Sequence, residues 1–318
     1  MASSLHLVYD WARRWSRMGF FATLLLVAVF NIFHTVISLT TQLTIALIAL
    51  LVGIPHGAID HLISIPRKPN NRFIAYIFIY IVIAVISGLL IATWSVNGFR
   101  AVVLMSALHF GFGDASFINE RKDAYGKPRR SFVIEFIYAI PAGFLPVVLP
   151  LTDSRTASAL QRIHPSLLSW DGGDARLIRN IVLISLILGL LIFTISKKFD
   201  LVIDLVLLAA LSIFAPPLIA FATYFGFWHA LRHTARLVPK LEKSRNLAIS
   251  GAWQKAITNA ITPGLYAVIG TLLLAATLMI TIPDKFSSSL LWSTLLIIWA
   301  LTVPHMISTA RFDLKVLR

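Results

Sequence analysis

The chain has 318 residues, of which 58% are hydrophobic and only 13% carry a charge, whereas a soluble domain has about 25% charged residues. This composition excludes an ordinary soluble enzyme and indicates an integral membrane protein. The chain contains no cysteine, which excludes a disulfide framework, a thiolate metal site and a cysteine nucleophile. Any metal ion must therefore be held by nitrogen or oxygen atoms.

Long apolar runs follow one another along the whole chain, and a run of about 18 residues can cross the hydrocarbon core as a helix. We expect a single all-α domain over residues 1–318, a polytopic transmembrane bundle of about ten spans. Pro216-Pro217 separates the short seventh span from the eighth by a tight turn, because proline cannot continue a helix. The predicted spans are residues 19–37, 43–64, 73–95, 100–118, 132–151, 178–196, 201–215, 217–237, 263–282 and 290–310.

The basic residues predict the orientation of these spans, since Lys and Arg are enriched in cytoplasmic loops. With the N-terminus inside, 22 of the 28 Lys and Arg residues fall on the cytoplasmic side. Both termini are then cytoplasmic, in the inner (plasma) membrane, with residues 1–18 as a cytoplasmic segment and 238–262 as a cytoplasmic, interfacial connection. The net charge of +14 is explained by loops that face anionic lipid headgroups, and no motif indicates a nucleic-acid partner.

Six of the nine histidines lie on predicted spans. An ionisable side chain inside a span is costly and marks a functional site by default. The four spans concerned all run from outside to inside, so at 1.5 Å rise per residue the six imidazoles can meet in one layer toward the cytoplasmic side. They are His56 and His61 on the second span, His109 on the fourth, His229 and His233 on the eighth, and His305 on the tenth.

The spacing within two of these segments indicates a metal site. His229 and His233 in FGFWHALRHTARL are four residues apart, so one helix face presents both rings to a single ion. His56 and Asp60 in GIPHGAIDHL have the same spacing, which lets the carboxylate orient an imidazole or reach a neighbouring ligand. A single membrane histidine is more often a structural hydrogen-bonding group, but several at one depth favour a metal. Imidazole suits Zn, Cu, Fe and Ni alike, so the ligands do not identify the ion.

The surroundings of the histidines favour a lipid-soluble substrate that enters from the bilayer. Glycines and aromatic residues flank His109 and His229, and such a segment can form the wall of an apolar channel, although each aromatic residue can equally pack against lipid or protein. The candidate channel residues are Phe110, Phe112, Tyr224, Phe225, Phe227 and Trp228.

Four ordered motifs give the chain a family resemblance. PHGAIDH (55–61), HFGFGD (109–114), WHALRH (228–233) and PHM (304–306) resemble the Brp/Blh family of bacterial and archaeal β-carotene 15,15′-dioxygenases. The resemblance implies an enzyme that uses O₂ and Fe(II) to split all-trans-β-carotene at its central double bond into two all-trans-retinal molecules. It implies His56, His109, His229 and His233 as iron ligands. Further motif positions are matched by Asp60, His61, Asp114 and His305. We expect these residues to orient the ligands without binding the ion themselves.

The resemblance also implies the partners of the reaction. These are β-carotene and O₂ as substrates, the lipid bilayer, and a functional link to a retinal-binding rhodopsin. No catalytic side chain is expected beyond the metal ligands. The alternatives are another membrane histidine metalloprotein, such as a di-iron hydroxylase or desaturase or a b-type haem protein, and a proton-coupled transporter. The chain has only one HxxxH box, whereas a di-iron site uses several.

Overall fold

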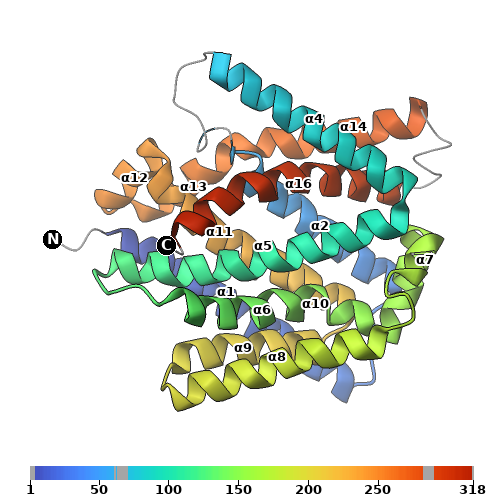
Figure 1. The fold of residues 1–318 in the computed structure, drawn as a ribbon, viewed down its shortest axis with the longest axis horizontal. Helices are drawn as coiled ribbons and strands as arrows, with labels where there is room; N and C mark the ends of the chain where they lie inside the picture. Colours follow the sequence, from blue (N-terminus) through green and yellow to red (C-terminus); the bar gives the residue numbers. More distant parts are fainter. Residues whose placement is uncertain (1–3, 61, 63–70, 282–289, 317–318) are drawn as a thin grey trace.

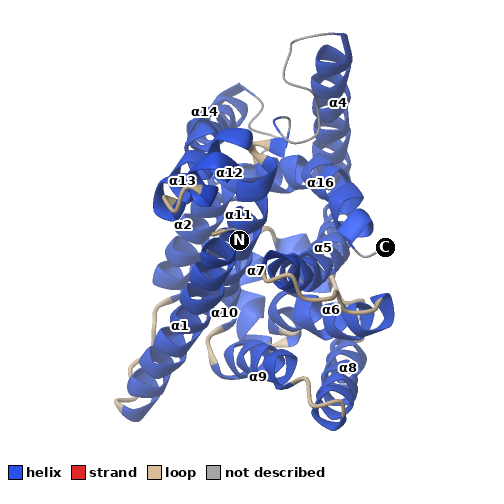
Figure 2. Cartoon of the chain, turned by 90° about the vertical axis from the view of Figure 1, so that its left-hand side faces the viewer, coloured by secondary structure: helices blue, strands red, loops and turns tan. Residues whose placement is uncertain are grey.

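A computed structural model of the chain describes residues 4–60, 62, 71–281 and 290–316. Within these ranges every regular element is a helix and no strand occurs (Figure 2). The prediction of an all-α fold is confirmed.

Each of the ten predicted apolar runs overlaps one or more helices in the described part of the chain. The eighth run is divided between α10, a π-helix and α11. The elements of the ten runs are α1 (Leu5–Ile32), α2 (Leu39–Gly57), α4 (Asn71–Thr93), α5 (Ser95–Ala124), α6 (Phe132–Val147), α8 (Ala175–Ile195), α9 (Phe199–Phe214), α10 (Pro217–Thr223), the π-helix (Tyr224–His229), α11 (Ala230–Leu237), α14 (Leu265–Thr281) and α16 (Leu290–Val316). Shorter helices are α7 (Ala157–Ile163), α12 (Glu242–Ile249) and α13 (Trp253–Ile261), and 3₁₀ turns form at Pro150–Thr152, Ser154–Thr156, Pro165–Ser169, Val238–Lys240 and Thr262–Gly264.

Seven stretches of helix in the described part of the chain are long and apolar enough to cross a membrane. They are Leu5–Ile32, Leu39–Gly57, Asn71–Thr93, Ser95–Ala124, Ala175–Ile195, Trp253–Thr281 and Leu291–Ala310. Helices α6 and α9 have only 16 residues each, and the eighth run is interrupted by the π-helix. These dimensions support a membrane protein, while the count of ten spans stays a prediction.

Two segments expected to be polar connections are helical. Helix α1 begins at Leu5 rather than near residue 19, because the basic residues of its first turns do not stop a helix, and Arg17 pairs with Asp204 of α9 at 2.6 Å. The connection over residues 238–262 forms α12 and α13. These two helices pack against α1 in a small apolar cluster around Val8 and Ala256.

The break predicted at the double proline is confirmed. Helix α9 ends at Phe214, and Pro217 begins α10. Helix α10 then passes into the π-helix Tyr224–His229, which the sequence did not reveal. A π-helix adds one residue to a turn and so changes which side chains share a face, and it occurs frequently at functional sites.

Helices α5 and α16 lie in the middle of the bundle, between α4 and α14 on one side and α8 and α9 on the other (Figure 1). Helix α5 also packs closely along α6. A Cβ atom on Gly143 of α6 would lie 1.8 Å from the carbonyl oxygen of Ala107, and one on Gly111 of α5 would lie 2.0 Å from that of Ala139. Only glycine permits such an approach of two helix backbones. The crossing fixes α5 at the level of His109.

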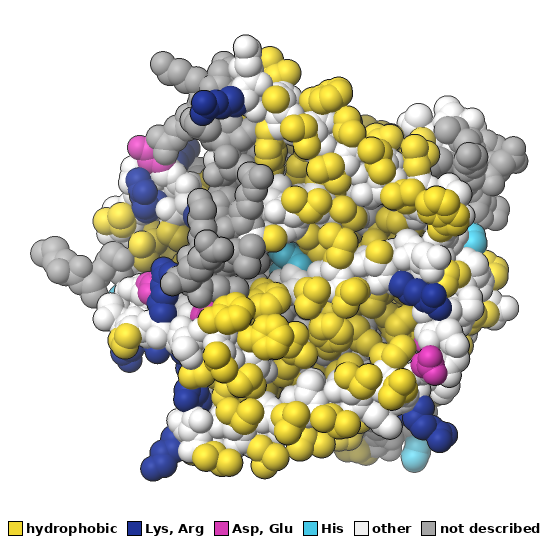
Figure 3. Space-filling view, viewed as in Figure 1, with side chains coloured by type: hydrophobic (Ala, Val, Ile, Leu, Met, Phe, Trp, Pro, Cys, Tyr) yellow, Lys and Arg dark blue, Asp and Glu magenta, His cyan; other side chains and the backbone are white. Residues whose placement is uncertain are grey.

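The outer surface matches a membrane environment. On the face shown in Figure 3, apolar side chains cover the middle of the molecule, and most of the Lys and Arg side chains lie at its left edge. The exposed large side chains of α4 and α8 include Ile74, Phe78, Ile181 and Leu191. Such a broad apolar surface is expected of a protein that faces lipid rather than water.

Candidate metal centre

The four histidines predicted as ligands meet inside the bundle. His56 comes from α2, His109 from α5, and His229 and His233 from the π-helix and α11. The centroid of the His56 ring lies 5.1 Å from that of the His229 ring and 5.0 Å from that of the His233 ring. The centroid of the His109 ring lies 5.2 Å from that of the His229 ring. Nitrogen atoms of His109, His229 and His233 all lie within 4.8 Å of one another. All four side chains are buried.

Several ring nitrogens at this point have no hydrogen-bond partner among the described residues: Nδ1 of His56, Nε2 of His109, Nε2 of His229 and both nitrogens of His233. A buried polar atom without a partner is costly. Three imidazoles whose nitrogens lie within 4.8 Å of one another, with the ring of His56 beside them, are a donor set that suits a transition-metal ion. The residues present therefore fit a metal.

The adjacent stripe of the same segment is engaged in buried ion pairs. The guanidinium group of Arg232 lies 3.1 Å from a carboxylate oxygen of Asp204 and 3.7 Å from one of Asp114. It stacks on the ring of Trp228, 3.5 Å from the centroid, and the indole N–H of Trp228 donates a hydrogen bond to Asp114. Arg232 also donates to the hydroxyl of Ser16 at 3.2 Å. These contacts fix the π-helix and α11 against α1, α5 and α9.

Arg236 extends the ion pairs by one helical turn. Its guanidinium group donates to Glu120 of α5 at 3.0 and 3.3 Å, and Lys240 lies 3.6 Å from the same carboxylate. Because Arg232 and Arg236 are four residues apart, they share one face of α11. His229 and His233 form the neighbouring stripe, since each lies three residues before one of these arginines.

A carboxylate and a fifth histidine lie beside the four imidazoles. The Nδ1 atom of His305 on α16 is 2.8 Å from a carboxylate oxygen of Asp60. The His305 ring lies 5.1 Å from that of His109 and 5.6 Å from that of His56. Asp60 thus contacts the neighbouring imidazole of His305. His61, predicted beside it, lies outside the described residues.

Thr309 is a contact that the sequence did not predict. Its hydroxyl lies 3.2 Å from Nδ1 of His109 and 3.0 Å from the carbonyl oxygen of His305. A hydroxyl has a single proton. If the hydroxyl donates this proton to the carbonyl, it must accept one from Nδ1–H of His109, which leaves the lone pair of His109 on Nε2. No sequence signal marks Thr309, because only the packing of α16 on α5 brings the two side chains together.

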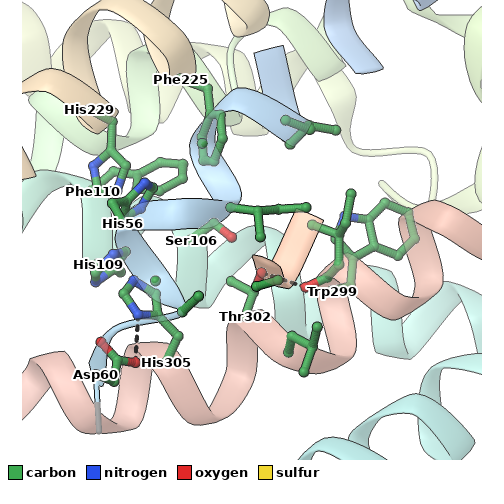
Figure 4. A pocket seen from close by; sticks show the side chains of 18 of the residues that line it. His56, Asp60, Ser106, His109, Phe110, Phe225, His229, Trp299, Thr302 and His305 are labelled. Atoms are coloured by element: carbon green, nitrogen blue, oxygen red, sulfur yellow. Dashed lines mark hydrogen bonds and ion pairs between the residues drawn. The ribbon is translucent and has the colours of Figure 1, made fainter. Parts of the chain in front are cut away.

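An apolar cavity of about 310 Å³ adjoins the histidines. Figure 4 shows His56, His109, His229 and His305 at one end of it and Trp299 at the other. Its walls come from α2, α4, α5, α10, the π-helix, α14 and α16. Among the channel residues predicted from sequence, Phe110 and Phe225 line this cavity.

A sequence profile of the family described as beta-carotene 15,15′-dioxygenase matches residues 47–313. The chain belongs to the β-carotene 15,15′-dioxygenase family. It is also 27% identical over 272 residues to a protein named beta-carotene 15,15′-dioxygenase from the uncultured marine bacterium 66A03, an alignment that covers 80% of this chain and 88% of that protein. No solved structure matches the chain significantly.

The part of the chain that matches the β-carotene 15,15′-dioxygenase family contains the entire histidine cluster. Residues 47–313 run from the middle of α2 into the last turns of α16 and include Asp60, His305 and Thr309 as well as the four predicted ligands. The site is therefore built from the region that this chain shares with other dioxygenases of the family.

Four of the predicted channel residues are not among the residues that line this cavity. Tyr224 and Trp228 are fully buried in the protein core, Phe112 packs near Phe136, and Phe227 is half exposed. The prediction assumed that neighbours of a histidine in sequence face the same space. The side chains of a helix instead point around its axis at about 100° per residue, and the π-helix changes the phase again.

Asp114 also lies away from the imidazoles. It follows His109 by five residues, which places it roughly 140° around α5. Its carboxylate accepts from Trp228 and pairs with Arg232. Asp114 contacts none of the four predicted ligands directly and acts on the segment that carries His229.

Proposed function

We propose that the chain is an iron-dependent membrane dioxygenase. Its substrates are all-trans-β-carotene and O₂, its reaction is cleavage of the central 15,15′ double bond, and its products are two molecules of all-trans-retinal. The observation that supports this most strongly is a buried group of histidines at the end of an apolar cavity, in a chain that belongs to the β-carotene 15,15′-dioxygenase family.

His56, His109, His229 and His233 are the proposed ligands. The nitrogens of His109, His229 and His233 converge, each of the four residues has a ring nitrogen without a hydrogen-bond partner among the described residues, and no carboxylate is needed to complete a set that suits Fe(II). Bound iron supplies the activation of O₂, for which the side chains alone have no chemistry. The pair formed by Asp60 and His305 supports the ligand group from the side of α16.

The cavity has the task of presenting one double bond out of many similar ones. Its described walls are almost entirely apolar, with Phe110 and Phe225 beside the histidines. An apolar wall excludes water and leaves the polyene no polar contact by which to orient itself. The position of the substrate is therefore set by shape, and a displacement of a few Å brings a different bond to the histidines.

The substrate enters from the bilayer in this proposal. The chain has about ten spans with both termini on the cytoplasmic side of the inner (plasma) membrane. Tyr76 and Tyr80 of α4 contribute to the cavity wall, and α4 is the most lipid-exposed of the long helices, with 11% of its most apolar window buried. A retinal-binding rhodopsin is a suitable recipient of the product, since retinal is itself soluble in the membrane.

The test is expression in bacteria that accumulate β-carotene, with extraction and chromatography of carotenoids and retinal. We expect cells that make the protein to lose orange colour and to gain all-trans-retinal. Cells that make His229→Ala at the same level should retain β-carotene. Unchanged carotene in cells that contain the well-expressed, iron-loaded protein would contradict the proposal.

A further inference from the structure

A second apolar cavity of about 140 Å³ lies beyond the first. Four side chains line both cavities: Leu50, Ser106, Phe221 and Trp299. We refer to these four residues as the neck and to the second cavity as the end chamber. Because the same side chains bound both spaces, the two cavities adjoin, and the first of them reaches the histidines.

The segments that carry the neck also carry the histidines. Leu50 precedes His56 by six residues on α2, and Trp299 precedes His305 by six residues on α16. Six residues of helix correspond to about 9 Å at 1.5 Å per residue. Leu50 and Trp299 therefore lie at an axial distance from their imidazoles that the helices themselves set, while Ser106 of α5 lies three residues, or about 4.5 Å, before His109.

Stacked rings join the neck to the site. The ring of Phe221 stacks on that of Phe225 at 6.0 Å, and Phe225 stacks on His229 at 5.9 Å. Three aromatic rings at successive turns form a continuous wall between the end chamber and the histidines. Such a wall is flat and apolar, as the face of a conjugated polyene requires.

We propose that the neck selects the bond that is cleaved: it admits the narrow polyene arm of a carotenoid and holds the terminal ring in the end chamber. This proposal rests on the proposed function and adds its specificity-determining residues. The arm between the central double bond and the ring of β-carotene has a length of the same order as the distance between the neck and the histidines. A ring seated beyond the neck therefore places the central bond at the proposed iron ligands.

The end chamber also predicts which rings it accepts. Its described lining is apolar except for Ser106 at the neck and Thr156, and the hydroxyl of Thr156 already donates to the carbonyl oxygen of Pro150 at 2.6 Å. A hydroxyl on the carotenoid ring would lose its hydration there, which is unfavourable without a partner. The chamber fits an unsubstituted hydrocarbon ring.

The first experiment widens the neck. Trp299→Ala should let the ring move toward the histidines and convert the single product into a mixture of retinal and aldehydes of unequal length, separated by chromatography. Trp299→Phe, which keeps a ring at the neck, should give mainly retinal and is the control for folding. Iron content is measured in each variant, because a change in products is informative only when the metal is retained.

The second experiment fills the end chamber. Ala46 lines the chamber, whereas Ile48 on the same helix is 54% exposed on the outer surface. Ala46→Trp should raise the KM for β-carotene at least about tenfold, and it should weaken binding of β-carotene measured anaerobically by the absorption of the bound pigment. Ile48→Trp should change neither quantity.

The outcomes separate the two proposals. A wild-type protein that holds iron and forms no retinal overturns the proposed function and the neck with it. If the wild-type protein forms retinal, the proposed function stands. The role of the neck is then overturned if Trp299→Ala still yields only retinal and Ala46→Trp binds β-carotene as tightly as Ile48→Trp does.

Discussion

Two adjacent faces of residues 224–237 carry polar side chains in different states. On one face, His229 and His233 have ring nitrogens without hydrogen-bond partners among the described residues. On the other, Arg232 and Arg236 pair with Asp114, Asp204 and Glu120. Both faces are buried, and both use a spacing of four residues, so neither burial nor periodicity distinguishes them.

The difference lies in whether the protein itself satisfies the polar groups. The carboxylates of α5 and α9 neutralise the arginine face, so this face holds the segment in place. The nitrogens of the histidine face have no such partner among the described residues. Rigidly paired arginines beside histidine nitrogens without partners are the features expected of a preorganised metal site. Changes on the histidine face should therefore affect metal and activity, and changes on the arginine face should affect stability.

Removal of the metal should have the largest effect. Dialysis of the purified wild-type protein against a chelator should abolish retinal formation, and Fe(II) should restore it, while the unfolding temperature falls by only a few degrees because the arginine face is intact. Activity is followed by the loss of carotenoid absorption. Full activity in protein shown to contain no metal would remove the basis for the distinction between the two faces.

Arg232→Met should destabilise the fold strongly. It leaves the buried carboxylate of Asp114 without its cation and Asp204 with Arg17 alone, a change that costs about 3–5 kcal/mol, measured by thermal unfolding in detergent. Arg155→Ala removes a pair with Asp153 in which the arginine side chain is 51% exposed, so its cost should stay below about 1 kcal/mol. Equal unfolding temperatures for the two variants would show that the arginine face is not a structural support.

Thr309→Val should weaken iron binding by about 10- to 100-fold, the usual effect of losing a group that orients a ligand. Valine keeps the shape of threonine and removes the hydroxyl that faces Nδ1 of His109. Thr309→Ser keeps the hydroxyl and should bind iron as the wild-type protein does. Competition with a chelator of known affinity measures the iron affinity of both variants. Equal affinities would show that the hydroxyl of Thr309 does not orient His109.

Trp228→Phe should have the smallest effect. It removes the hydrogen bond to Asp114 and retains most of the ring under Arg232, so stability should fall by about 1–3 kcal/mol with iron content unchanged. Thermal unfolding and metal analysis of the same sample provide the measurement. A loss of iron at unchanged stability would show that Trp228 supports the histidines rather than the stability of the fold.

The sequence predicted those features of the molecule that repeat along one helix. Apolar runs predicted the helices, and the spacing of His229 and His233 predicted that both rings share a face. Features that depend on contact between helices could not be predicted from the sequence. Thr309 and Trp299 reach their positions through the packing of α16. The directions in which the side chains of Phe227 and Trp228 point depend on the π-helix. Arg232, which pairs with Asp114, lies 118 positions later in the chain.

The ends of the first helix show the same limit. Charge placed Arg13, Arg14 and Arg17 in a cytoplasmic segment, but α1 already begins at Leu5. Arg17 lies within the helix and pairs with Asp204 of α9. A partner 187 residues away along the chain leaves no signal in the local composition.

The most direct test of the histidine face is the iron content of the purified protein and of four single variants, His56→Ala, His109→Ala, His229→Ala and His233→Ala. We expect close to one iron per chain in the wild-type protein and in Arg155→Ala, and a large loss of iron in each histidine variant. Iron retained at the wild-type level in all four variants would show that these imidazoles do not hold the metal.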